Sequence, residues 1–113
     1  MIRIPTNRPP THPGEMIREE FLGPLGMTQT ELAERLGVAW TRVNQLINGK
    51  RGVTPDTALR LERLFDMPAE FWLTLQLRWD LHQAKHAPEA RAIGRIRRAP
   101  GIRDRRATAK PRM

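Results

Sequence analysis

The chain contains no cysteine and no serine among its 113 residues. Without cysteine it can form neither a disulfide bond nor a thiolate, so the fold depends on packing alone and suits a reducing cytoplasm. Without either residue the commonest side-chain nucleophiles are missing, and since no glycine-rich phosphate loop occurs, we expect no enzymatic activity. No apolar run is long enough to cross a bilayer and the N-terminus lacks a secretory signal, so we expect a soluble protein without membrane contact.

The charge is unevenly distributed along a chain whose length fits one ordinary domain. Twenty Lys and Arg residues against twelve Asp and Glu residues give a net charge of +8. Residues 1–86 hold eleven basic and ten acidic residues, whereas residues 87–113 hold nine basic and two acidic residues. The first part is therefore nearly neutral, and attraction for an anionic partner is concentrated in the last 27 residues.

Composition predicts three segments. Prolines at positions 5, 9, 10 and 13 predict an extended arm over residues 1–13. Over residues 14–86 apolar side chains recur at intervals of three and four, which predicts an all-α domain. Residues 87–113 have few large apolar side chains, so we expect a disordered basic tail. That tail either adds electrostatic affinity for duplex DNA or is dispensable.

Five helices are expected within residues 14–86. The first runs from about Glu15 to position 21 or 22, where Gly23-Pro24 is expected to stop it. The second covers residues 29–36, with a capping box formed by Thr28 and Glu31, and Gly37 closes it. The others are expected near residues 39–48, over residues 55–65 after a threonine cap, and from residue 68 onward.

The second and third of these helices have the layout of a helix-turn-helix, in which the second helix of the pair enters the major groove of DNA. Ala33, four residues before Gly37, is small enough to let the two helices cross closely. A helical hairpin without a DNA role would share this pattern. However, the outward positions carry amides and hydroxyls, which bind base edges and phosphates, and no acidic residue occurs from position 38 to 53. The predicted DNA-binding residues are Gln29, Thr30, Ala39, Trp40, Thr41, Arg42, Asn44, Gln45, Asn48, Lys50 and Arg51.

The fifth helix carries two apolar stripes. At about 100° per residue, one side of the helix carries Phe71, Trp72, Leu75 and Trp79. Leu73, Leu77 and Leu81 fall on the other side, and we call these three residues the leucine stripe. One small domain can bury only one such face. The leucine stripe therefore predicts a two-fold homodimer in which it forms the interface.

Three stretches closely resemble the HigA family of antitoxins: residues 28–38, residues 42–61 with their Asn-Gly-Lys-Arg-Gly-Val-Thr-Pro-Asp-Thr-Ala core, and residues 68–76. Residues 8–15 are similar to the family's N-terminal arm, and the match covers about residues 8–85. Trp40 departs from the pattern, since the family usually has a polar or basic residue there. Its ring could contact a thymine methyl group or turn aside. The basic tail has no counterpart in the family.

The resemblance implies a five-helix, lambda-repressor-like (Xre-type) homodimer of the bacterial cytoplasm. It implies binding to a palindromic operator in double-stranded DNA on the nucleoid, repression of its own operon, and neutralisation of a HigB-type toxin, a RelE-like ribonuclease that cuts messenger RNA. Two alternatives remain open. One is a stand-alone Xre-type transcriptional regulator without a toxin, and the other is a basic protein that coats nucleic acid with little sequence preference.

A toxin that binds RNA is expected to be basic, so the basic tail would repel it. The acidic first helix, with Glu15, Glu19 and Glu20, is therefore the predicted toxin-binding surface, together with Arg8 and His12 of the arm.

His82 and His86 have a spacing that can bind a transition metal, with His12 as a possible third ligand. Ordinary polar positions near a helix end explain the same pair, because positive charge suits the helix dipole there. We expect no metal and no cofactor.

Overall fold

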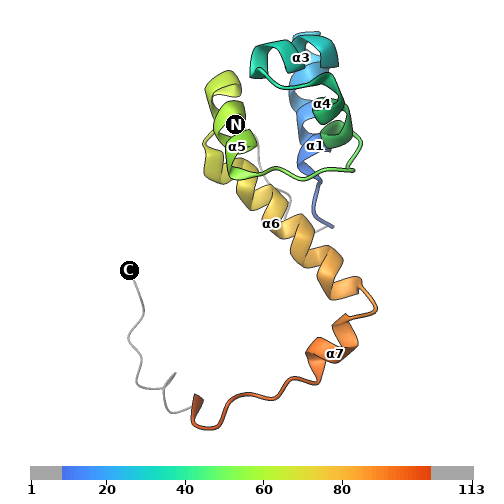
Figure 1. Cartoon of the computed structure of the whole chain (residues 1–113), viewed down its shortest axis with the longest axis vertical. Coiled ribbons are helices and arrows are strands. Elements are labelled where there is room, and N and C mark those ends of the chain that lie inside the picture. Colours follow the sequence, from blue (N-terminus) through green and yellow to red (C-terminus); the bar gives the residue numbers. More distant parts are fainter. Residues whose placement is uncertain (1–8, 103–113) are drawn as a thin grey trace. The chain divides into compact units, whose positions relative to one another are not determined.

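The computed structural model describes residues 9–102, and helices are the regular elements of that part of the chain. The all-α prediction is confirmed. The chain divides into two units between Gln83 and Ala84. The elements are α1 (Pro13–Ile17), the π-helical η1 (Arg18–Leu22), α2 (Gly23–Leu25), α3 (Gln29–Leu36), α4 (Trp40–Ile47), α5 (Pro55–Phe65), α6 (Ala69–His86) and α7 (Ala90–Gly94) (Figure 1).

The first helical segment continues through Gly23-Pro24, so the prediction that it ends there was wrong. α1 passes into η1, and α2 ends at Gly26, which has a left-handed φ of 63°. In η1 the Gly23 amide donates to the carbonyl of Arg18, five residues back. In an ordinary α-helix a proline clashes with the carbonyl four residues back and cannot pair with it. The wider π turn relieves this conflict at Pro24, which is why the chain stays helical.

α3 and α5 begin and end where their sequence signals predicted. Thr28 Oγ1 accepts a hydrogen bond from the Glu31 amide at 3.0 Å, and α3 ends at Gly37 with a φ of 71°. The Glu31 carboxylate accepts instead from Arg35 Nε at 2.9 Å, so the structure shows the threonine half of the predicted capping box. Thr54 caps α5 in the same way as Thr28 caps α3.

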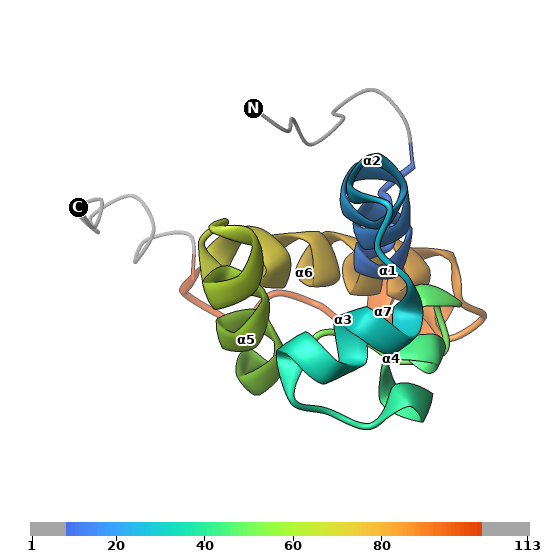
Figure 2. The ribbon, with the colours of Figure 1, turned by 90° about the horizontal axis from the view of Figure 1, so that it is seen from above.

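Trp72 of α6 is fully buried in the core. Figure 2 shows α6 extending from beside α5 and crossing α1. The Trp72 side chain has no exposed surface, and its ring centroid lies 5.6 Å from that of Phe21 and 5.0 Å from that of Phe71. Its Nε1 has no hydrogen-bond partner within residues 9–102, so packing holds the ring. Leu75, one turn along, is 1% exposed. The prediction that this stripe of α6 faces the core is confirmed.

α1 packs directly on the backbone of α4. Gly14 of α1 is buried, and a Cβ atom built on it would lie 1.9 Å from the Leu46 carbonyl oxygen and 3.0 Å from the Ile47 Cα. Only a residue without a side chain permits this approach. The beginning of α1 therefore fixes the position of the end of α4.

The second unit contains α7, whose residues are all at least partly exposed. This single helical turn was not predicted, because the two alanines at positions 90 and 92 give only weak local helix propensity. Ile93 and Ile96 are 58% and 75% exposed, so among the described residues this segment builds no core of its own. The predicted disorder at residues 103–113 lies outside the described residues. No helix within residues 9–102 combines the length and apolar character needed to span a membrane.

Candidate nucleic-acid interface

α3 and α4 form the helix-turn-helix corner that the sequence predicted. The amides of Gly37 and Val38 both donate to the Ala33 carbonyl, at 2.9 and 3.1 Å, which ends α3 and turns the chain toward α4. Gly37 takes the left-handed conformation that closes such a turn. Val43 and Leu46 of α4 are 1% and 2% exposed in the shared core. The opposite face of α4 is therefore the one turned to solvent.

α4 begins without a side-chain cap. Ala39 stands at its N-cap position and has no side chain that could bond the first amides, whereas Thr28 caps α3. The uncapped amides and the positive end of the helix dipole suit a phosphate oxygen. Trp40, which is 48% exposed, and the exposed Thr41 form the first turn of α4, and Thr30 is exposed in the first turn of α3.

Three amide side chains join α3 to the outer side of α4. Asn44 Nδ2 donates to Gln29 Oε1 at 3.0 Å, and Asn48 Nδ2 donates to Asn44 Oδ1 at 3.2 Å. The sequence indicated each of these residues as a DNA contact but gave no sign that they bond to one another. The links restrict the side chains before any ligand binds, which lowers the entropy cost of using them for recognition.

Gln45 and Arg51 form a second link at the other end of α4. Arg51 Nε and Nη2 both donate to Gln45 Oε1, at 3.0 and 2.9 Å, and the Lys50 amide donates to the Gln45 carbonyl at 2.8 Å. All three residues are exposed. The two cationic side chains therefore follow immediately on the end of α4, next to the amides of its outer face.

Arg42 of α4 is bonded to two side chains of α5. Its Nη2 donates to Asp56 Oδ2 at 3.0 Å and also to Thr57 Oγ1. Arg60 Nε donates to Asp56 Oδ2 at 3.0 Å, and Arg60 Nη1 donates to the Leu36 carbonyl at 2.8 Å. These hydrogen bonds from Arg42 and Arg60 hold the pKa of Asp56 below its usual value. The pairing is present at neutral pH and is lost as pH falls through that lowered pKa.

No sequence pattern predicted this connection between α3, α4 and α5. Asp56 lies in the first turn of α5, where the helix dipole alone explains a carboxylate. Its spacing of four residues from Arg60 is a recognisable helical ion pair. Arg42 is fourteen residues away, and nothing in a single sequence links it to Asp56.

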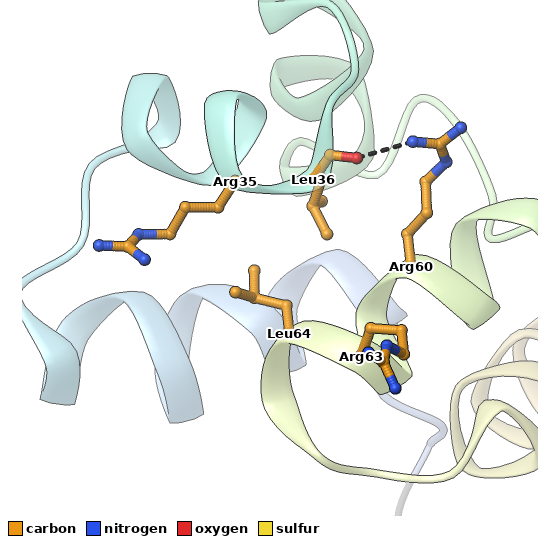
Figure 3. A pocket seen from close by; sticks show the side chains of 5 residues that line it. All are labelled: Arg35, Leu36, Arg60, Arg63 and Leu64. Carbon is orange, nitrogen blue, oxygen red and sulfur yellow. Dashed lines mark hydrogen bonds between the residues drawn. The ribbon is translucent and has the colours of Figure 1, made fainter.

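A hollow of about 350 Å³ lies between α3 and α5, lined by Arg35, Leu36, Arg60, Arg63 and Leu64 (Figure 3). Three arginines around one hollow suggest an anion site. Figure 3 shows, however, that their guanidinium groups point apart, with that of Arg60 directed to the Leu36 carbonyl. The arrangement therefore offers no convergent set of donors to a single anion.

The three acidic residues predicted to bind a toxin are all exposed, Glu15 on α1 and the other two on η1. Glu19 accepts a hydrogen bond from Arg18 Nε at 3.3 Å, in a pair whose side chains are 51% and 63% exposed. So exposed a pair is worth little energy, and it lowers the net negative charge of the surface. The remaining negative charge of this surface comes from Glu15 and Glu20. Arg8 lies outside the described residues.

His12 is buried and caps the N-terminus of α1. It is 6% exposed, its Nδ1 accepts a hydrogen bond from the Gly14 amide at 2.9 Å, and its ring contacts Trp79 edge-on at 5.1 Å between centroids. Burial lowers its pKa, against an opposing effect of Asp80 and Glu15. Little of its surface is available to a partner. Residues 9–102 contain no cluster of three or more His, Asp or Glu side chains that could hold a metal ion.

The leucine stripe on α6 is divided by the structure. Leu73 is half-buried and packs against the core, whereas Leu77 and Leu81 are 57% and 48% exposed. Two large apolar side chains one turn apart thus remain in contact with water within this chain.

A family model described as helix-turn-helix matches residues 17–72. The virulence-associated protein I of Dichelobacter nodosus is 46% identical over 77 residues, which cover 68% of this chain and 71% of that protein. The antitoxin HigA-1 of Vibrio cholerae is 42% identical over 82 residues, covering 72% of this chain and 76% of the relative. The chain belongs to the HigA family of helix-turn-helix antitoxins.

Solved structures of this family have the same fold. The antitoxin GraA is 41% identical, with a TM-score of 0.77 over 82% of this chain and 100% of its own. GraA in complex with its operator gives a TM-score of 0.74 at 39% identity, over 86% of this chain and 98% of that chain. Other relatives of this chain are described as HTH-type transcriptional regulators.

Proposed function

We propose that this protein is the antitoxin of a type II toxin-antitoxin module and represses its own operon by binding operator DNA. The observation that carries the proposal is the outer side of α4. It has an uncapped helix N-terminus at Ala39, linked amides at Asn44 and Asn48, and cations at Lys50 and Arg51. Such a surface suits phosphates at both ends and base edges between them. The operator complex of GraA, a protein of the same fold, supports this interpretation.

The binding species we propose is a homodimer. Leu77 and Leu81 are exposed apolar residues on one face of α6, and a second copy of that face would remove both from water. A two-fold dimer binds an inverted repeat, with half-site centres about 34 Å apart or a multiple of that distance. The target is therefore expected to be palindromic.

The partner we propose is a HigB-type, RelE-like toxin that is neutralised in the bacterial cytoplasm. The similarity to the antitoxin HigA-1 of Vibrio cholerae supports this choice. The relatives described as HTH-type transcriptional regulators favour a second candidate, a regulator with no toxin. The genes beside this one decide between the two candidates. If a neighbouring gene encodes the toxin, its small basic product should arrest growth when expressed alone and should co-purify with this protein when the two are expressed together. A neighbouring product that does neither would favour the stand-alone regulator.

Single alanine substitutions should separate base recognition from phosphate binding. Asn44→Ala and Gln45→Ala should each relax the preference at one base pair of the half-site by about 1–3 kcal/mol. Lys50→Ala should lower the affinity for all duplexes alike, because a phosphate contact carries no base information. Competition binding against a library of half-site variants measures both effects.

Glu34→Ala is the control, since Glu34 is exposed on α3 and is not a predicted contact. Equal losses on operator and mixed-sequence duplex for Asn44→Ala, Gln45→Ala and Lys50→Ala would contradict the assignment of base recognition to α4.

Charge reversal on the first helical segment should impair neutralisation of the toxin. With Glu15, Glu19 and Glu20 all changed to Lys, a basic toxin would meet like charge on the surface proposed to bind it. We expect cells that express the toxin to resume growth with the unaltered protein and to remain arrested with the triple variant. Growth recovery at matched antitoxin levels is the measurement.

The matched control is Glu34→Lys, which reverses an exposed acidic residue on another helix. A second control ends the chain at His86 and removes the basic tail. Full protection by the triple variant, or loss of protection on tail removal alone, would show that the toxin binds elsewhere.

A further inference from the structure

The loop between α4 and α5, residues 48–54, carries Lys50 and Arg51. Its first half is held by α4 through the Lys50 amide and the Arg51 guanidinium, both bonded to Gln45. Its second half is held by a different helix. The Val53 amide donates to Gln76 Oε1 of α6 at 2.7 Å, across 23 positions of sequence.

Gln76 is itself held in one orientation. Its Nε2 donates to Asp80 Oδ1 at 2.9 Å, one turn further along α6. Because the carboxylate can only accept, the nitrogen of the Gln76 amide faces Asp80 and the oxygen faces Val53. Val53 is 6% exposed, so its amide would be left largely without water if this acceptor were removed.

Gly52 provides the space for this contact. A Cβ atom on Gly52 would lie 2.8 Å from both Cδ and Nε2 of Gln76. Glycine at position 52 therefore allows the Gln76 side chain to approach the loop closely. The Gln76 side chain is flexible, so a methyl group at position 52 would displace it without forcing two backbones apart.

We propose that Gln76 is a positioning residue for DNA binding: from α6 it fixes the 48–54 loop so that Lys50 and Arg51 are preorganised for phosphate contacts. The inference rests on the proposed DNA-binding function and adds a residue that touches no DNA. A loop already held in its bound conformation loses less entropy on binding, so affinity rises without a new contact. Because the residues it positions bind phosphates, Gln76 affects affinity and its salt dependence while leaving sequence preference unchanged.

The test is fluorescence anisotropy with a labelled mixed-sequence duplex over a range of salt concentrations. Gln76→Ala should bind about tenfold more weakly than the unaltered protein, because the released loop must then be ordered on binding. The slope of log affinity against log salt should also fall, by about 0.9 for each phosphate that the variant no longer binds. In a Lys50→Ala, Arg51→Ala background the same substitution should have no further effect.

Gln83→Ala is the matched control, an exposed glutamine on the same helix, and should leave both affinity and slope unchanged. Gly52→Ala should reproduce the effect of Gln76→Ala, and the two together should cost no more than either alone, which keeps the test valid if one variant folds poorly. An unchanged slope for both variants, or an equal loss in the Lys50→Ala, Arg51→Ala background, would overturn the role of Gln76. If the unaltered protein binds no duplex at all, the proposed function fails as well.

Discussion

Gly14→Ala is expected to destabilise the protein by about 3 kcal/mol or more, which for a domain of this size lowers the Tm by roughly 15 °C. The added methyl carbon would stand 1.9 Å from the Leu46 carbonyl oxygen. The α1 backbone fixes the position of the methyl carbon and the oxygen belongs to the α4 backbone. No rotamer change can therefore relieve the overlap, and α1 must move away from α4. Thermal unfolding followed by circular dichroism measures the loss.

Gly23→Ala is the matched control on the same helical segment. The nearest atom to its added methyl would be the Arg18 carbonyl oxygen at 3.5 Å, an ordinary contact distance. Its backbone is helical, with a φ of −60°, so alanine should be neutral or stabilise by about 0.5 kcal/mol. A Gly14→Ala variant as stable as Gly23→Ala would show that α1 does not pack on α4 in this way.

Leu77→Asp is expected to convert a homodimer into a monomer. Leu77 is 57% exposed within one chain, so the substitution should leave the fold of that chain intact. In a dimer it would bury an unpaired carboxylate against the partner, at a cost of about 3 kcal/mol, which weakens association about a hundredfold. Analytical ultracentrifugation should show the change in mass, and affinity for the palindromic operator should fall because two half-sites are no longer bound together.

Leu25→Asp is the control for this prediction. Leu25 is 61% exposed on α2, away from the leucine stripe, and should tolerate the charge without any change in mass. A Leu77→Asp protein that sediments like the Leu25→Asp protein would place the dimer interface elsewhere.

Local signals in the sequence predicted most helix boundaries of the first unit. Thr28 and Thr54 each supply a capping oxygen, and Gly37 supplies a left-handed residue, so these ends depend on neighbours within four positions. The rule that a proline ends a helix also uses a single residue, and at Pro24 it predicted a helix end that the structure does not have. The π turn before Pro24 lets the helix continue, and no local signal in the sequence marked that turn.

The outward residues of α4 were predictable because helical periodicity separates Asn44 and Gln45 from the buried Val43. The hydrogen bonds that these side chains form were not predictable. Asn44 bonds to Gln29 on another helix, and Arg51 bonds to Gln45 across a turn, so both depend on how the chain folds back. The sequence therefore indicated which side chains face outward, whereas the fold determined which of them are held in place.

The sequence by itself determined the helical class, the helix-turn-helix corner and the family, because periodicity, caps and a long shared motif are properties of neighbouring residues. Only the tertiary structure decided that His12 is a buried cap, that Arg42 pairs with Asp56, and that Gln76 holds the Val53 amide. The last two contacts join residues 14 and 23 positions apart, and the buried His12 ring contacts Trp79, far along the chain. Such partners are chosen by helix packing, which no local pattern encodes.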